Sequence, residues 1–257
     1  MTRPGFGLKP AREDRPATGR CRWGGPALLE PGTDWPEREG LPLSLIAVLD
    51  TQEPAPWLGE ELPVRPGLLN FFYAKPDTGS EEALRRFRDM SFGPGMCRVI
   101  PADPVRAGER EAPPLAEVFD PVPLHAHPVV TLPEAGGCDV DPALNALDLG
   151  SRVEESLLYP LDAGWFVHDH FADVWTRFRA DEQTLDRSDQ AFGWTPFVQP
   201  TPVHIPDREK NYRHLLTVST NGLWDWHRGS GSLHFVIPEE ALREGDFTQA
   251  LPDTDTG

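Results

Sequence analysis

Histidines at alternate positions are the first residues in this sequence that could do chemistry. His125 and His127 lie two positions apart, and so do His168 and His170. On a β-strand, residues two positions apart face the same side, so both imidazoles of a pair could reach one metal ion. Neither pair belongs to a metal motif such as HExxH, and spacing alone does not make a site. We therefore expect no metal and no cofactor, with His125 and His127 as the ligands to examine if a metal did bind.

The sequence contains no assembled catalytic motif. It has no GxSxG nucleophile elbow, no GxxxxGK[ST] phosphate loop and no GxGxxG dinucleotide loop. Cys97 falls in an apolar stretch, where a thiol packs as a small hydrophobic side chain. The acidic pairs Asp139/Asp141 and Glu239/Glu240 stand beside helix-start signals, which favours a capping role. These observations identify no catalytic residue and favour a protein that is not an enzyme.

Aromatic residues in turn-rich stretches are better candidates for a binding site. They could form a groove, or they could lock proline-rich loops onto a sheet, and the sequence allows both. Asp50 ends the first apolar run and Asp225 lies between two tryptophans, so both would line such a groove. The candidate binding residues are Trp23, Trp35, Asp50, Trp194, Gln199, Trp224 and Asp225.

The charge is strongly acidic, with 24 basic and 41 acidic residues and a net charge of −17. Such a surface repels nucleic acid and anionic membranes and attracts basic partners, although it also simply maintains solubility. The cysteines, Cys21, Cys97 and Cys138, are odd in number, far apart and without a CxxC pair. This pattern indicates reduced thiols in the cytoplasm. No stretch approaches the roughly 20 apolar residues of a membrane span.

The 29 prolines favour short strands over long helices, because an interior proline costs a helix about 3 kcal/mol. Apolar runs predict buried strands at 43–49, 67–74, 212–220 and 232–237, a shorter strand at 96–100 and an edge strand at 127–132, where Pro128 cannot donate to a ladder. Capping and charge patterns predict short helices at 80–90, from 141, at 151–158 and from 238.

We expect one domain of the α+β class over residues 21–250, rich in β structure, with mainly antiparallel sheets and a few short helices. The chain is long enough for a real core. Residues 1–20 are polar and basic, and we interpret them as a flexible leader with a turn at Gly5–Gly7. Residues 251–257 are interpreted as a frayed acidic tail.

Two segments follow the same plan. PLSLIAVLDTQ and then GLLNFFYAKP occur early in the chain, and YRHLLTVSTNG and then GSLHFVIPEE occur late. Each has a buried strand, a polar closure, a variable loop, a glycine and a second buried strand. An internal duplication and a pair of ordinary hairpins both fit this pattern.

A set of short motifs resembles the YwqG-like family, a bacterial domain of unknown function. The motifs are, in order, Gly24-Gly25-Pro26, Pro31-Gly32, Trp35-Pro36, LIAVLD, Gly67-Leu68-Leu69, Phe192-Gly193-Trp194-x-Pro196-x-x-Gln199, LLTVST, Gly231-x-Leu233-x-Phe235 and Gly245-Asp246-Phe247. The resemblance covers about residues 20–250. It implies a single β-rich α+β domain and no established activity, cofactor or catalytic residue. The family usually has glutamine where this chain has Ala47-Val48, and often where it has Thr217.

The resemblance also implies a genomic setting near toxin or secretion genes, which suggests an immunity or accessory role. We therefore expect a cytoplasmic, non-catalytic binding protein that partners a basic protein and does not bind nucleic acid or membranes. The alternatives are a hydrolase-like enzyme and a small-ligand binding module with a pocket of loop aromatics.

Overall fold

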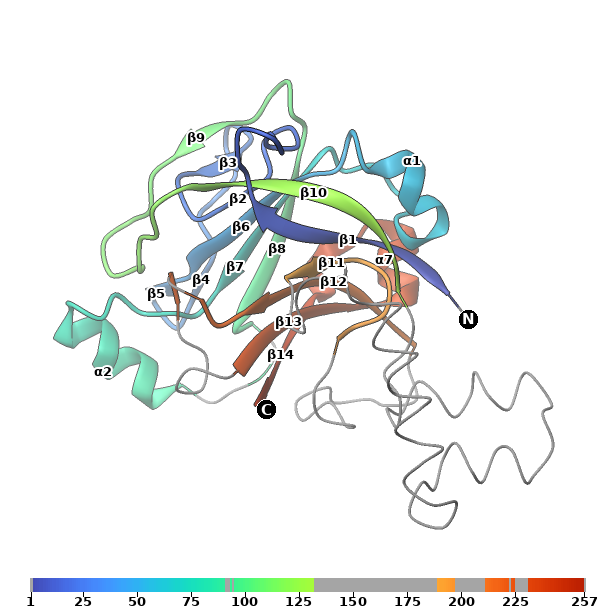
Figure 1. Ribbon diagram of the computed structural model, residues 1–257. Helices are drawn as coiled ribbons and strands as arrows, with labels where there is room; N and C mark the ends of the chain where they lie inside the picture. The colour runs from blue at the N-terminus through green and yellow to red at the C-terminus, as the bar shows by residue number, and fades with distance from the viewer. Residues whose placement is uncertain are drawn as a thin grey trace, which may run out of the picture.

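The structure, a computed structural model, describes residues 2–90, 93, 95–131, 189–196, 211–221, 223–224 and 231–256. Ten of its strands form one antiparallel sheet in the order β14-β13-β12-β11-β1-β10-β2-β6-β7-β8 (Figure 1). Their bounds are β1 Arg3–Pro10, β2 Arg22–Trp23, β6 Ser44–Asp50, β7 Leu68–Tyr73, β8 Cys97–Ala102, β10 Val122–Thr131, β11 Gln190–Ala191, β12 Tyr212–Ser219, β13 Gly231–Pro238 and β14 Leu251–Thr256. The fold is thus rich in antiparallel β structure, as expected.

Two small sheets and a few short helices complete the described residues. The small sheets pair β3 with β9 and β4 with β5. Their bounds are β3 Ala27–Leu29, β9 Gly108–Arg110, β4 Glu37–Arg38 and β5 Leu41–Pro42, and the helices are α1 Ala55–Leu58, α2 Glu81–Asp89 and α7 Glu239–Glu244, with single turns η1 Gly59–Glu61 and η2 Phe247–Gln249.

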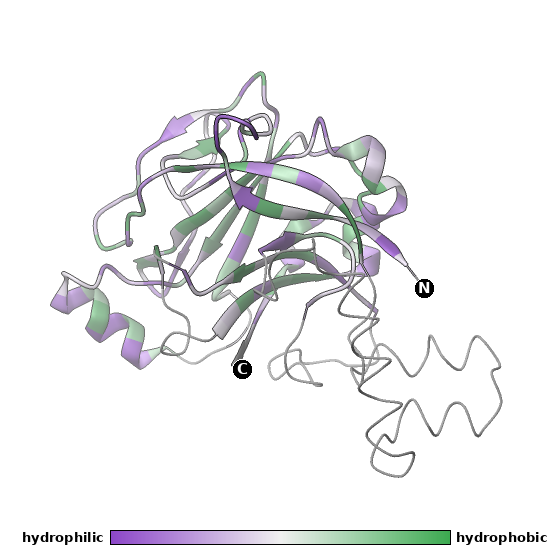
Figure 2. Ribbon diagram, in the orientation of Figure 1, coloured by the Kyte–Doolittle hydropathy of each residue, from purple (hydrophilic) through white to green (hydrophobic). Residues whose placement is uncertain are grey.

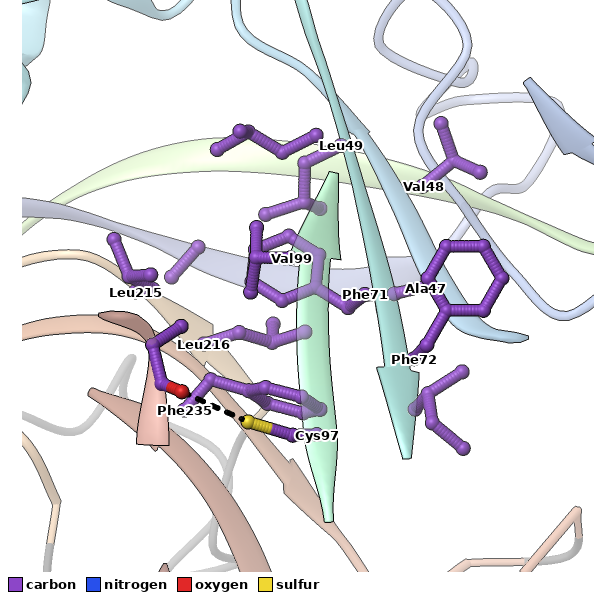
Figure 3. Packing of buried hydrophobic residues seen from close by; sticks show 14 of the residues in the cluster. Ala47, Val48, Leu49, Phe71, Phe72, Cys97, Val99, Leu215, Leu216 and Phe235 are labelled. Atoms are coloured by element: carbon purple, nitrogen blue, oxygen red, sulfur yellow. Dashed lines mark hydrogen bonds between the residues drawn. The ribbon is translucent and has the colours of Figure 1, made fainter. Parts of the chain in front are cut away.

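The sheet curves until its two flanks face each other, giving a nearly closed barrel. The long pair β1 and β10 joins the flank β2-β6-β7-β8 to the flank β11-β12-β13-β14 (Figure 1). Across the core the rings of Phe71 and Phe235 meet edge to face at 5.2 Å (Figure 3). At the seam, the Cys97 thiol donates a hydrogen bond to the Ala250 carbonyl at 3.4 Å. Figure 2 shows the hydrophobic colouring concentrated on the inner strands of both flanks.

The strongest sequence patterns give the expected elements. The apolar runs form β6, β7, β12 and β13, and β7 lies inside the sheet between β6 and β8. The helix predicted at 80–90 is α2, and the Ser80 hydroxyl accepts from the Ala83 N–H at 3.2 Å as an N-cap. The helices predicted from 141 and at 151–158 lie outside the described residues.

The first residues differ from the expected flexible leader. β1 pairs with β10 along its whole length and lies in the middle of the sheet. Phe6 and Leu8 alternate with glycines and point into the core, where they are 4% and 3% exposed. The expected turn at Gly5–Gly7 is therefore wrong, because strand alternation with two apolar residues outweighs the glycines.

The C-terminal segment and the predicted strand 127–132 also differ from expectation. Residues 251–256 form β14, which pairs with β13 and includes the buried Asp253, so this stretch is not frayed. β10 is longer than predicted and pairs with β1 on one side over Leu124–Thr131. On its other side it meets β2 only at Val122 and Pro123, which leaves Pro128 where no N–H is needed.

The hairpins β6–β7 and β12–β13 contain the same irregularity. In β6, Ile46 is skipped in the register immediately before the residue that pairs with Phe71. In β12, Leu215 is skipped immediately before the residue that pairs with Phe235. One extra residue at this position bends a strand and increases its twist, so both hairpins curve at the same place.

A short strand and a left-handed turn accompany each bulge. The Gly24 N–H donates to the bulge carbonyl of β6 at 2.9 Å, and the Phe192 N–H donates to that of β12 at 3.3 Å. Gly24 and Gly25 have φ of 56° and 75°, and Phe192 and Gly193 have φ of 59° and 77°. Phe192 shows that a side chain can adopt this φ, but a Cβ at Gly24 would lie 2.7 Å from the Phe119 carbonyl oxygen, so glycine is needed at that position.

Candidate functional site

A pocket of about 570 Å³ opens where β6 ends, β7 begins and β8 ends. Ligand pockets commonly measure about 300–1,000 Å³, so it could hold part of a ligand or a side chain of a partner. It is lined by Glu30, Thr51, Gln52, Ala55, Pro56, Arg65, Pro66, Gly67, Pro101, Ala102, Asp103 and Pro104.

Hydrogen bonds between the strand ends hold two of the lining residues together. The Thr51 N–H and hydroxyl both donate to the Gly67 carbonyl, at 2.7 and 3.0 Å, and fasten the end of β6 to the start of β7. Gly67 has φ of +80°, and a Cβ there would lie 2.4 Å from Cδ of Pro104. Glycine at this position therefore lets the loop after β8 pack directly against the start of β7.

Three charged residues line the pocket. Glu30 accepts the Asp103 N–H at 2.9 Å through Oε1 and pairs with Arg106 through Oε2. Asp103 accepts the Val105 N–H at 2.8 Å through Oδ1. Arg65 forms no ion pair with any residue that the structure describes. The lining thus holds two carboxylates and one guanidinium, and one carboxylate already binds a cation.

Exposed apolar side chains adjoin the lining. Trp57, next to Pro56, is 42% exposed, and Val105, next to Pro104, is 90% exposed. The Trp57 indole N–H donates to the Gly5 carbonyl at 3.0 Å, which fixes the ring against β1. A fixed tryptophan beside a pocket is typical of protein interfaces, where such side chains contribute much of the affinity.

The predicted tryptophans lock loops to the core. Trp23 and Trp224 are 2% and 3% exposed and meet edge to face at 5.6 Å. The Trp224 indole N–H donates to the Ser219 carbonyl at 3.0 Å. Trp35 donates to the Leu43 carbonyl at 2.8 Å. These rings serve packing and hydrogen bonding, the second of the two roles that the sequence allowed.

The other predicted binding residues are dispersed. Asp50 is 8% exposed and accepts the N–H groups of Arg20 and Gln52, each at 3.2 Å, so it closes loops next to the pocket. Trp194 lies under the Arg3 guanidinium, 3.5 Å from its ring centroid. Gln199 and Asp225 lie outside the described residues.

The histidine pair of β10 has its rings side by side. His125 and His127 are 6.3 Å apart between centroids, with planes 8° apart. The Pro16 carbonyl lies 2.8 Å from Nδ1 of His125; since a carbonyl can only accept, that nitrogen carries the proton. In the described part of the chain, no three His, Cys, Asp or Glu side chains are grouped as metal ligands would be. His168 and His170 are outside that part.

A row of buried polar side chains in the second flank was not predicted from the sequence. The Thr217 hydroxyl oxygen lies 2.8 Å from Nε2 of His214 and 2.8 Å from Nδ1 of His234. Nδ1 of His214 donates to the Phe192 carbonyl at 3.0 Å, so in neutral His214 the Nε2 atom accepts. Thr217 therefore donates to His214 and accepts from His234. The available signal was the presence of polar residues, His214, Thr217 and His234, within the apolar runs of β12 and β13.

The hydroxyl in this row is closed off from solvent. Thr217, His214 and His234 are 1%, 2% and 0% exposed. An imidazole within hydrogen-bond reach of a hydroxyl is the geometry of an activated nucleophile, which also needs access to its substrate. The described thiols are buried as well, and burial raises the pKa of Cys21 to about 12, which keeps it protonated at neutral pH.

Comparison with known proteins gives one family match. The family described as "Domain of unknown function (DUF1963)" matches residues 21–255. No curated protein matches the chain. Among the described residues, no helix has both the length and the apolar character to cross a membrane.

Proposed function

Because the chain belongs to the DUF1963 family of unknown function, we propose a function from its own geometry: a non-catalytic binding protein that engages a basic protein partner at the pocket between β6, β7 and β8. The observation that carries this proposal is a charged pocket whose lining residues Pro56 and Pro104 are followed in the chain by an exposed tryptophan and an exposed valine. An immunity or accessory role in a bacterial cytoplasm is consistent with such a partner.

The charge of the chain supports a basic partner. Two of the three charged lining residues are acidic, and the chain carries a net charge of −17. Complementary charge accelerates encounter and selects partners, and its effect weakens as salt increases. The exposed side chains of Trp57 and Val105 offer apolar contact area that charge alone does not. The fitting partner segment therefore alternates lysine or arginine with apolar residues.

Selection from a displayed library of random peptides tests this proposal. Wild-type protein is expected to enrich peptides that combine lysine or arginine with apolar residues. Val105→Ser should weaken binding of the selected peptides about threefold to tenfold, since it removes an exposed apolar side chain next to the lining residue Pro104. The matched control is Val118→Ser, which alters another exposed valine, 66% exposed, whose chain neighbours do not line the pocket. Enrichment of acidic peptides, or equal effects of the two variants, would contradict the proposal.

A hydrolase-like enzyme is the second candidate, supported by the hydroxyl of Thr217 between two imidazoles. Incubation with a fluorophosphonate probe and mass spectrometry tests it. Covalent labelling of Thr217 that is lost in Thr217→Val would favour the enzyme. An unlabelled, folded wild-type protein would eliminate this reading. A small-ligand binding module, the remaining alternative, would use the same pocket as the protein partner.

We also propose that the chain is YwqG-like, of the α+β class, and an internal duplication. The matching bulges at Ile46 and Leu215 support the duplication, as do the left-handed turns at Gly24-Gly25 and Phe192-Gly193. The strand order supports it too, since β2-β6-β7-β8 extends outward from β10 as β11-β12-β13-β14 extends outward from β1.

A further inference from the structure

Glu30 is held at the pocket by the loop that follows β8. Its Oε1 accepts the Asp103 N–H at 2.9 Å, which fixes the carboxylate and directs Oε2 to a cation. The side chain of Glu30 is 22% exposed, so its charge is less screened than that of a fully exposed carboxylate. The pocket thus contains a pre-oriented anion.

The cation on Oε2 comes from the chain itself. Arg106 supplies it from an exposed turn, and its side chain is 65% exposed. Such surface ion pairs contribute little to stability. The turn is closed separately, because the N–H groups of Arg106 and Ala107 donate to the Asp103 carbonyl at 3.0 and 2.8 Å. The arginine side chain can therefore leave Glu30 while the turn keeps its shape.

We propose that Arg106 is an internal stand-in for a basic side chain of the partner, and that Glu30 is the carboxylate which that side chain engages. Binding exchanges one ion pair for another: Arg106 turns to solvent, and a lysine or arginine of the partner takes its position on Oε2. This inference rests on the proposed function and identifies its anchor and its competitor.

Glu30 suits this role better than the other lining carboxylate. Asp103 is exposed, and its Oδ1 already accepts a backbone N–H of its own turn. A guanidinium or ammonium group bound to Asp103 would face a carboxylate that is more hydrated and more strongly screened than Glu30. The attraction between the two charges would therefore be weaker. The pocket also has space beside Glu30, bounded by prolines, for the aliphatic part of a long basic side chain.

Fluorescence anisotropy with a labelled peptide of four Lys-Leu repeats tests the exchange. The peptide of four Glu-Leu repeats is the probe control. Arg106→Gln removes the competitor and should tighten binding about twofold to fivefold, the range expected for loss of one surface ion pair. Its matched control is Arg110→Gln on β9, which changes the net charge equally. Arg110 donates a hydrogen bond to the Thr33 carbonyl, whereas the Glu30 carboxylate pairs with Arg106.

Glu30→Gln keeps the acceptor for the Asp103 N–H and removes the charge, so it should weaken binding about tenfold. Its matched control is Glu111→Gln, an exposed acid outside the lining. Thermal unfolding of each variant verifies the fold.

The outcomes separate the two proposals. If wild-type protein binds the lysine peptide but each variant equals its matched control, the exchange is overturned and the binding surface stands. If wild-type protein binds neither peptide, or prefers the glutamate peptide, the proposed function itself fails.

Discussion

The β6–β7 and β12–β13 hairpins share a register and a bulge but differ in the polar residue buried at one equivalent position. In each hairpin this residue precedes the phenylalanine opposite the bulge: it is Asn70 in the first and His234 in the second, both 0% exposed. Asn70 bonds the backbone of β3, accepting the Leu28 N–H and donating to the Leu28 carbonyl, each at 2.8 Å. His234 bonds the side chain of Thr217.

The difference is that the first polar residue holds a neighbouring strand, whereas the second joins a row of buried side chains. An amide offers a donor and an acceptor together, so Asn70 can satisfy a strand that crosses the face of the sheet. That strand, β3, ends next to Glu30 and so places a carboxylate at the pocket. An imidazole in the second hairpin instead completes a row of side chains that is closed to solvent. Under the proposed function, the first flank binds the partner and the second flank has a structural role.

Asn70→Ala should cause the largest loss of stability among the variants that separate the two hairpins. It leaves the N–H and carbonyl of Leu28 without their bonds and deletes a third bond, to the Ile100 carbonyl at 3.2 Å. Buried polar groups without partners cost about 1–3 kcal/mol each, so unfolding in urea should reveal a loss of about 3–4 kcal/mol. Peptide binding should weaken as well, because β3 positions Glu30. A loss below about 1 kcal/mol would refute the role assigned to Asn70.

Thr217→Val should cost about 2 kcal/mol, measured in the same way. It removes the hydroxyl between the two imidazoles and leaves both buried nitrogens without that bond. The first hairpin has Val48 at the equivalent position, so the backbone accepts valine there. Thr217→Ser keeps the hydroxyl and is the control. If peptide binding fell with Thr217→Val in a folded protein, the assignment of a purely structural role to the second flank would be wrong.

Asp189→Asn should remove a pH dependence of folding stability that arises in the second flank. Burial raises the pKa of Asp189 to about 7, although its Oδ1 accepts the Ser219 N–H at 2.7 Å. Its pKa in the unfolded chain is about 3.9, so the unfolded state releases the proton first as the pH rises. The protonated carboxyl therefore favours folding below about pH 4, and stability falls between about pH 4 and 7.

Asparagine keeps an oxygen that can accept the Ser219 N–H, and it has no charge to bury. At pH 8 the variant should be more stable than wild type by about 1–2 kcal/mol, and the two should agree at pH 4. Urea unfolding at both pH values checks this. Equal stability at pH 8 would show that the carboxyl is not buried at a cost.

Ser80→Ala should have the smallest effect, about 1 kcal/mol of stability. The connections after β7 and β13 each contain a helix, but the helices are capped differently. α2 begins with the Ser80 hydroxyl bound to the Ala83 N–H, whereas α7 has no side-chain N-cap and ends at Gly245 in a left-handed conformation. Thermal unfolding measures the loss, and Ser80→Asp, which retains a cap, should show little.

The sequence predicts the inner strands well and the site poorly, for physical reasons. Continuous apolar runs such as 43–49 have no solvated face, so they indicate buried strands directly. β1 is concealed because glycines alternate with Phe6 and Leu8. The pocket is concealed because its walls come from three separate strand ends, which only the register brings together. Trp23 and Trp224 were predicted as binding residues, but aromatic residues in turns serve packing equally well.

A titration of ¹⁵N-labelled protein with the Lys-Leu peptide, followed through backbone amide shifts, locates the binding surface. We expect saturable shifts at the pocket, including Thr51, Gly67 and Asp103, little change along β12 and β13, and no response to the Glu-Leu peptide. Shifts confined to the second flank, or an equal response to both peptides, would contradict the proposed function.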